Sequence, residues 1–457
     1  MLSFLDIYER TLEGPVMSEN DFDMKIFIPK LNEIVKKYEI NYNKDNIVPS
    51  DDKWSDNLYE AAIDFLCQVG MYCQDTNRII QFTRDEIIKA VKEAPGRCYA
   101  GEGKDAGVFE TRKPEDKKLP WFHMGSGIVF TSDELAMNLV EGCALVGGSN
   151  SVSLPAMDSI QGIPVSAGSP AEIYAAIQRV RVGREALRRA GRPGMPIMNL
   201  NSTAATAITT IAASAPQFGC RPTDGWLCGA VSEMKIDFGT MNKIAYLLNW
   251  GANICAETSP ILGGFCGGPE GTAVVSVAYI LVGLMIYHAN YMLHFPIHFS
   301  KGCTTTRNVL WVVSISCQAI SRNIPMPVIW DPYCAAGPNT QMFFYEAAAY
   351  ILSSIPSGAA SFETPHPLKG VKKYAYTPME AKFGVEMGTA ATNISRNRAN
   401  EMVIKLLEKY ESKLDNAPEG NTYQECFDII KGKPNKEYVK LYDDVKNELI
   451  NMGIPFE

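Results

Sequence analysis

The stretch NICAETSPILGGFCGGPEGTAVVSVAYILVGLMIY, residues 253–287, holds a short apolar run, a glycine-rich loop and a long apolar segment. The pattern predicts a strand over 253–259 and a helix over 272–289. The apolar run 274–287 is shorter than the ~20 residues that cross a bilayer. We therefore expect a helix that is buried on several sides, for instance at a subunit contact, rather than a membrane span.

The same strand–helix unit repeats on both sides of this stretch. Further strands are predicted at 151–157, 196–201, 226–231, 296–300, 327–331 and 359–363, with helices at 171–190, 238–251, 305–322 and 340–353. Such alternation is typical of a parallel sheet, either closed as a TIM (β/α)8 barrel or open and doubly wound. No G-x-G-x-x-G follows the first strand and no P-loop is present, which favours the α/β barrel. The pattern does not reveal an eighth strand.

The two ends of the chain have a different sequence pattern, without the strand–helix alternation. Amphipathic helices are predicted at 23–40, at 55–70 with Ser55 as N-cap, and at 83–96 after a Thr83 cap, followed by a polar excursion over 101–120. We predict an N-terminal helical and mixed region packed on the barrel (1–125), the barrel itself (126–395) and a C-terminal helical extension (396–457).

The composition is that of a cytoplasmic enzyme with a large core. Of 457 residues, 46% are hydrophobic and 21% charged, and the net charge of −8 argues against nucleic acid as a partner. The opening MLSFLDIYERTLEG carries acids and no basic segment, so we expect neither a signal peptide nor membrane binding. The twelve cysteines form no C-x-x-C pair and are interpreted as reduced, mostly buried thiols.

In a barrel, chemistry takes place at the carboxyl ends of the strands. There the sequence places Glu257 after NICA and Asp331 after PVIW. Two acids near aromatic side chains suit a cationic ligand, although each acid could instead cap the helix that follows it. The other strand-end candidates are Met198 to Asn201, Trp226, Ser300, Trp330, Tyr333 and Glu363.

Two further motifs carry less weight. The loop GGFCGGPEG (263–271) could hold an anion on its backbone N–H groups or allow a close approach over the mouth. His294 and His298 lie four residues apart on a predicted strand, a separation of ~13 Å that is too long for one shared ion. We expect no bound metal.

Several segments resemble the monomethylamine methyltransferases of methanogens. They are GRPGM (191–195), SPILGGFCGGPEGT (259–272), CAAGPNTQM (334–342), TPMEAKFGVEMGTA (377–390) and the tail APEGNTYQECFDIIKGKPNKEYVKLYDDVKNELINMG (417–453). Their order and almost all of their spacing match the family from the N-terminal helices to the C-terminus.

The resemblance implies a TIM barrel that forms a homo-oligomer and moves a methyl group from an amine to Co(I) of a separate corrinoid protein. The cobamide would come from that partner, because the chain has no D-x-H-x-x-G corrinoid-binding segment and no tightly bound cofactor is expected. A protonated or quaternary nitrogen leaves as a neutral amine, so the protein has to hold a cationic nitrogen and exclude water.

The resemblance also locates the pocket. The third residue after GRPGM is pyrrolysine in the family and Met198 here, with a local loop that is two residues longer. Glu257 falls on a family active-site glutamate, while a second glutamate falls on Leu227 and a glutamine on Asp331. No lysine-like electrophile occurs in 196–203, and a thioether cannot form an imine with an amine.

Three interpretations follow. The favoured donor is a quaternary or otherwise cationic amine, held by the catalytic acids Glu257 and Asp331 between Trp226, Trp330 and Tyr333, with Leu227 making the pocket drier. The donor could instead be a sulfonium or a methylated aromatic. Finally, the chain could be a non-catalytic paralogue that binds the corrinoid protein.

Overall fold

The computed structural model describes residues 2–201 and 204–456 and contains a closed barrel. Seven parallel strands form one curled sheet in the order β6-β5-β16-β15-β13-β11-β9. The segment 196–200 closes the gap between the two edge strands, because Ile197 bridges Val152 and Leu200 bridges Trp226, both in parallel. This confirms the α/β TIM (β/α)8 barrel expected from the sequence.

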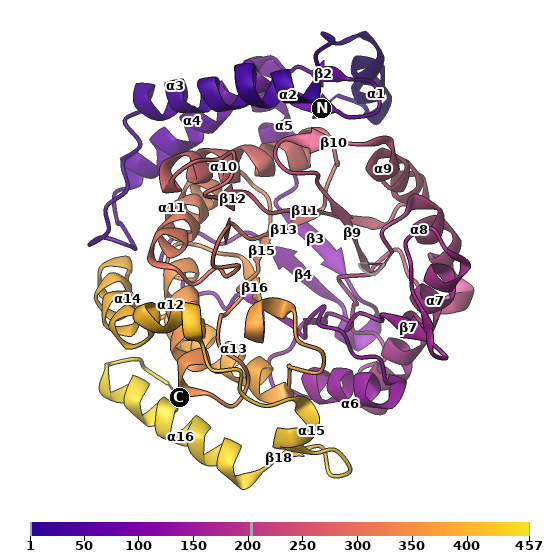
Figure 1. Cartoon of the computed structure of the whole chain (residues 1–457), viewed down its shortest axis with the longest axis vertical. Helices are drawn as coiled ribbons and strands as arrows, with labels where there is room; N and C mark the ends of the chain where they lie inside the picture. The colour runs from indigo at the N-terminus through magenta and orange to yellow at the C-terminus, as the bar shows by residue number, and fades with distance from the viewer. Residues whose placement is uncertain (1, 202–203, 457) are drawn as a thin grey trace.

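Figure 1 shows the ring of helices around the strands. The strands of the sheet are β5 (Trp121–Met124), β6 (Ser151–Val152), β9 (Gly225–Gly229), β11 (Asn253–Thr258), β13 (Tyr291–His294), β15 (Val328–Trp330) and β16 (Ser361–Glu363). The helices that follow the eight wall segments are α6 (Asp133–Ala144), α7 (Pro170–Arg189), α8 (Ala207–Ala213), α9 (Phe238–Trp250), α10 (Pro269–Met285), α11 (Arg307–Asn323), α12 (Gln341–Ser354) and α13 (Pro378–Ala391).

Two strands differ from the sequence-based expectation. The strand that the pattern did not reveal is β5, whose four residues are all buried and therefore show no polar–apolar alternation. The strand predicted at 296–300 is wrong, because the wall strand is β13, directly upstream. Residues Ile297–His298 form β14, which pairs with β12 (Ile261–Leu262) in a separate two-stranded sheet.

Helix α10 contains most of the long apolar run 274–287. Every residue of α10 from Gly271 to Met285 is buried, and the helix packs against α4 (Asp52–Val69) and α11. A helix covered on several sides needs no polar face, which explains its uniform hydrophobicity. Within the described residues, no helix has the length and apolar character needed to span a membrane.

The N-terminal region packs against one side of the barrel (Figure 1). Helix α5 (Arg84–Glu93) begins at the expected Thr83 cap, which forms a capping box with Glu86. Helix α4 begins earlier than predicted. Its N-cap is Asp51, whose carboxylate accepts from the amides of Lys53 and Trp54, and not Ser55. The remaining elements are α1 (Phe4–Glu13), α2 (Glu19–Asp21), η1 (Phe22–Phe27), α3 (Ile28–Lys37), α5 (Arg84–Glu93) and the sheet of β1 (Met71–Cys73), β2 (Arg78–Ile80) and β10 (Lys235–Ile236).

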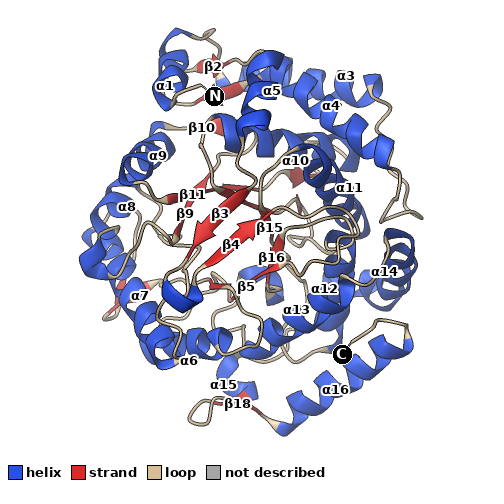
Figure 2. Ribbon diagram, turned by 180° about the vertical axis from the view of Figure 1, so that it is seen from behind, coloured by secondary structure: helices blue, strands red, loops and turns tan. Residues whose placement is uncertain are grey.

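The polar segment 101–120 contains half of a hairpin that closes one end of the barrel. Strands β3 (Arg97–Ala100) and β4 (Gly107–Glu110), joined through η2 (Gly103–Asp105), lie across the barrel in Figure 2. Phe109 packs its ring against Trp121 and Tyr291, at the first residues of β5 and β13, with centroid distances of 5.7 and 6.0 Å. The end at which the strands begin is therefore sealed, and the carboxyl end is left for a ligand.

The C-terminal extension is helical, as expected. Helix α14 (Arg396–Tyr410) packs on α12, and α16 (Lys436–Asn451) lies outside it. The remaining elements of the chain are η3 (Pro216–Phe218), η4 (Pro367–Gly370), η5 (Glu411–Asn416), α15 (Tyr423–Cys426), β7 (Ser159–Ile160), β8 (Ile163–Pro164), β17 (Phe427–Asp428) and β18 (Lys433–Pro434).

Candidate active site

The interior of the barrel has an apolar layer that contains Met198. Met198 is 0% exposed and belongs to one cluster with Leu227, Leu293 and Ile329. The Tyr291 hydroxyl donates to the Met198 carbonyl at 2.5 Å, which ties the segment 196–200 to β13 across the barrel. Met198, which the resemblance aligns with pyrrolysine, is thus a fully buried thioether in an apolar cluster.

Three carboxylates lie next to this apolar layer, towards the mouth at the carboxyl ends of the strands. Glu257 follows the interior residue Cys255 by two positions on β11, and Asp331 follows Ile329 by two positions after β15. Because side chains alternate across a strand, both acids face the interior. Glu363 ends β16 and is paired in register with His123 of β5.

Burial and mutual repulsion shift the pKa values of these acids upward. Burial raises the pKa of Glu257 to about 7, with a further contribution from the charge of Glu363. Burial raises the pKa of Asp331 to about 7 and that of Glu363 to about 8. Each acid would regain its charge at neutral pH if a cation were bound beside it.

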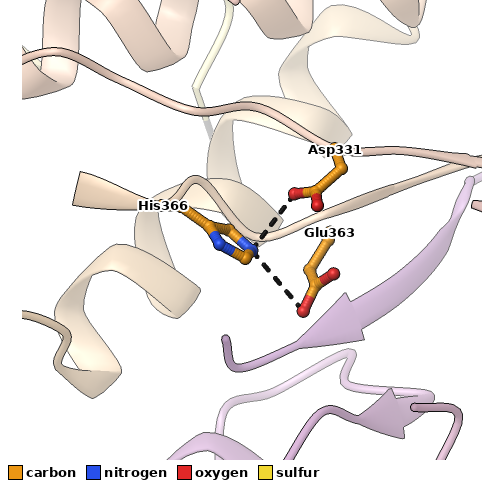
Figure 3. A group of neighbouring side chains, drawn as sticks. All are labelled: Asp331, Glu363 and His366. Atoms are coloured by element: carbon orange, nitrogen blue, oxygen red, sulfur yellow. Dashed lines mark ion pairs between the residues drawn. The ribbon is translucent and has the colours of Figure 1, made fainter. Parts of the chain in front are cut away.

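Asp331 and Glu363 converge on His366, which lies in the loop after β16 (Figure 3). The His366 Nε2 atom is 3.1 Å from Asp331 Oδ1 and 3.5 Å from Glu363 Oε1. All three residues are buried, and burial lowers the pKa of His366, which favours its neutral form.

Two aromatic rings line the same side of the mouth. The ring of Tyr333 packs against His366 at 4.7 Å and against Phe295 at 5.1 Å between centroids. Phe295 belongs to the interior cluster with Met198, and both rings are half-buried. Tyr333, one of the predicted pocket rings, therefore lies beside the acids, and Phe295 packs against it.

The two tryptophans predicted as pocket walls lie elsewhere. Trp226 precedes the interior residue Leu227, so it points outward, where Nε1 donates to Ser214 Oγ and the ring meets Trp250. Trp330 precedes Asp331 and packs its ring against His294 outside the barrel. Successive side chains on a strand point to opposite faces of the sheet. Because Leu227 and Asp331 face the interior, the neighbouring Trp226 and Trp330 face outward.

The other strand-end candidates are also away from the acids. Ser300 is exposed beyond β14, while the Asn199 and Asn201 side chains bond to Leu154 and Ser214 in the wall loops. His294 Nδ1 bonds to Thr258 Oγ1, whereas His298 is half-buried on β14.

The glycine-rich loop satisfies part of its own backbone. The Gly263 amide donates to the Gly267 carbonyl, and the Gly267 amide donates to Gly264. The loop is a compact turn in front of α10.

Sequence reasoning missed three residues of the site: His123, Phe295 and His366. His123 lies on the strand that the pattern did not reveal, with its ring nitrogens 2.8 Å from Ser151 Oγ and 3.0 Å from Ser153 Oγ. Phe295 follows the true wall strand β13. His366 comes three residues after Glu363, and that spacing from a strand-end acid was the available signal.

A closed (β/α)8 barrel with acids gathered at the carboxyl ends of its strands defines an α/β-barrel enzyme with a site for a small ligand. The family model for monomethylamine methyltransferase MtmB matches residues 2–454. The chain is 31% identical to monomethylamine methyltransferase MtmB2 of Methanosarcina acetivorans, over 99% of this chain and 98% of that protein. It is 30% identical to MtmB1 of Methanosarcina barkeri with the same coverage.

Solved structures give the same result. The crystal structure of the Methanosarcina barkeri monomethylamine methyltransferase MtmB matches with a TM-score of 0.95 at 30% identity, over 99% of this chain and 98% of that one. A hydroxylamine complex of MtmB matches equally well. The chain belongs to the monomethylamine methyltransferase MtmB family, which confirms the enzyme class expected from the sequence, a corrinoid-dependent methyltransferase. The family acts with a separate corrinoid protein.

Proposed function

We propose that this enzyme transfers a methyl group from a quaternary or otherwise cationic amine to Co(I) of a partner corrinoid protein, without a covalent adduct. The observation that carries the proposal is Glu257, an interior carboxylate above the apolar layer of Met198 and Leu227. Met198 offers no electrophile for a primary amine. A cationic donor needs none, since its leaving group is a neutral amine.

The charge at the mouth supports a cation. Glu257 has no salt bridge within the described part of the chain, and the nearby Lys243 ammonium is bonded to the Ala204 carbonyl. Tyr333 and Phe295 supply ring faces of the kind that attract methylated cations.

The corrinoid partner would approach at the carboxyl end of the strands, because the β3–β4 hairpin seals the other end. Loops on that side expose large apolar side chains, namely Ile163 (60%), Phe265 (42%), Phe299 (71%) and Val371 (79%). Apolar groups exposed on several loops at the same end of a barrel are typical of a docking face. The cobamide itself belongs to the partner, and the enzyme supplies the donor site.

A donor panel tests the proposal. The purified enzyme is mixed with a Co(I) corrinoid protein and, separately, monomethylamine, quaternary amines, a sulfonium and a methoxylated aromatic, and the absorbance of methyl-Co(III) is followed. We expect methyl transfer from a quaternary amine and none from monomethylamine. Transfer from monomethylamine alone, or from no donor, would overturn the proposal.

Docking is tested separately with Phe299→Asp. This change should raise the KM for the corrinoid protein and leave the KM for the donor unchanged, since Phe299 lies on the outer loop. Tyr99→Asp is the matched control, because Tyr99 is 59% exposed on β3 at the sealed end. Equal effects of the two variants would contradict the docking face.

A further inference from the structure

The cluster of Asp331, Glu363 and His366 offers three ligand atoms that face one point. One oxygen of each acid and one ring nitrogen lie within 4.8 Å of one another. Asp331 follows β15, Glu363 ends β16 and His366 belongs to the next loop, so the barrel wall itself brings them together (Figure 3).

The three facing atoms are buried and lack hydrogen bonds. Asp331 Oδ1, Glu363 Oε1 and His366 Nε2 have no hydrogen-bond partner within the described residues, and the residues are 2–3% exposed. The 3.1 Å separation of Asp331 and His366 is short enough for a hydrogen bond, but the two groups are not oriented for one. Unpaired buried polar atoms are costly, so this arrangement calls for a group that all three can bind.

The His366 ring is also held from behind by a hydroxyl group. Ser126 Oγ lies 3.2 Å from His366 Nδ1, which leaves Nε2 free to face the cluster. An outer hydrogen bond that orients an imidazole in this way is typical of metal sites.

We propose that Asp331, Glu363 and His366 bind one divalent transition-metal ion, Zn²⁺, Mn²⁺ or Fe²⁺, at the barrel mouth. Ligand atoms ~2.1 Å from an ion at tetrahedral or octahedral angles lie roughly 3.0–3.4 Å apart, close to the two separations found here. Imidazole among the ligands disfavours Mg²⁺ and Ca²⁺, which prefer oxygen alone.

The ion changes the charge distribution of the mouth. Two ionised carboxylates neutralise a divalent ion, so Glu257 remains as the negative charge available to a cationic donor. Three protein ligands leave at least one coordination position for water or for a polar group of the donor. The sequence predicted no metal, because two of these ligands follow strand ends that are far apart along the chain.

Ion binding is measured on the protein alone, so the result does not depend on the proposed donor. Chelator-treated enzyme is titrated with Mn²⁺ in a calorimeter, since Mn²⁺ binds poorly to the twelve free cysteines. We expect one ion per chain, and an affinity loss of at least ~100-fold in Glu363→Gln and His366→Asn. Ser126→Ala, which removes only an outer bond, should lose ~10–100-fold.

His298→Asn and Glu257→Gln are the controls. His298 is half-buried on β14, and both variants should keep the ion affinity, while Glu257→Gln alone should raise the KM for a cationic donor. Circular dichroism of the ion-free variants verifies their fold. An absence of stoichiometric binding to the wild type, or equal losses in His298→Asn, would overturn the metal site and leave the proposed methyl transfer standing.

Discussion

The substitution Glu257→Gln tests the charge on which the donor site depends. It keeps the shape of the side chain and removes the carboxylate from the barrel interior. At an effective dielectric constant of ~20, a carboxylate and a cation ~4 Å apart attract by about 4 kcal/mol. Glu257 is only half-buried, and solvent screening reduces this to about 2 kcal/mol. The expected result is a KM for the cationic donor that rises ~30-fold, since each 1.4 kcal/mol is a factor of ten.

The assay follows methyl-Co(III) formation with saturating Co(I) corrinoid protein and varied donor. Because the charge acts on the donor before and during transfer, we expect KM to carry most of the change and kcat to change little. Glu408→Gln, the same chemical change at an exposed position on α14, should leave both constants unchanged. A KM within twofold of the wild type in Glu257→Gln would refute the reasoning.

Four further predictions concern the barrel interior and its wall. Since burial raises the pKa of Glu257 to about 7, the KM for a quaternary donor should fall as pH rises through 7, and this dependence should be weaker in Glu257→Gln, where Asp331 and Glu363 still titrate. Met198→Ala should lower the free energy of unfolding by ~2–5 kcal/mol in urea denaturation, whereas Met198→Leu should cost under ~1.5 kcal/mol, because the site is packed core. Tyr333→Leu should raise the KM for the donor by ~2- to 30-fold in initial-rate measurements, because the ring face that attracts the cation is lost. Trp226→Phe should instead lower the unfolding free energy by about 1–2 kcal/mol and leave KM unchanged, since its Nε1 bonds to Ser214 outside the barrel; a KM effect would place its ring in the pocket.

Strand–helix alternation predicted most of the barrel correctly, because polar helices such as α7 separate the short apolar strands clearly. The errors fall where a strand is buried on both faces. In β5 and β13 every residue is buried, and without a polar alternation the sequence contains no marker of where the strand begins or ends. The misplaced β13 also hid Phe295, and the missing β5 hid His123.

The acids of the site and Tyr333 were predictable, whereas the orientation of the two tryptophans and the part played by Phe295 were not. Glu257 and Asp331 interrupt apolar strands, which is a strong local signal. Whether Trp226 or Leu227 faces the interior depends on the phase of a strand, which neighbouring strands determine. His366 was missed for a different reason. Its spacing from Glu363 can be seen in the sequence, but its position beside Asp331 depends on the pairing of β15 with β16.

The backbone matches that of MtmB closely, with a TM-score of 0.95 at 30% sequence identity. The two pockets therefore differ in their side chains and share the backbone that carries them. A barrel wall that holds Met198 in packed core cannot capture an amine covalently, whatever the neighbouring residues. Charge is then the means left for holding a donor, and Glu257 provides it in the function that we propose. The differences from the family that the resemblance implies at Met198, Leu227 and Asp331 are consistent with that proposal. In it, the donor is held as an ion and leaves as a neutral amine, so the chemistry that an adduct would supply is already present in the substrate.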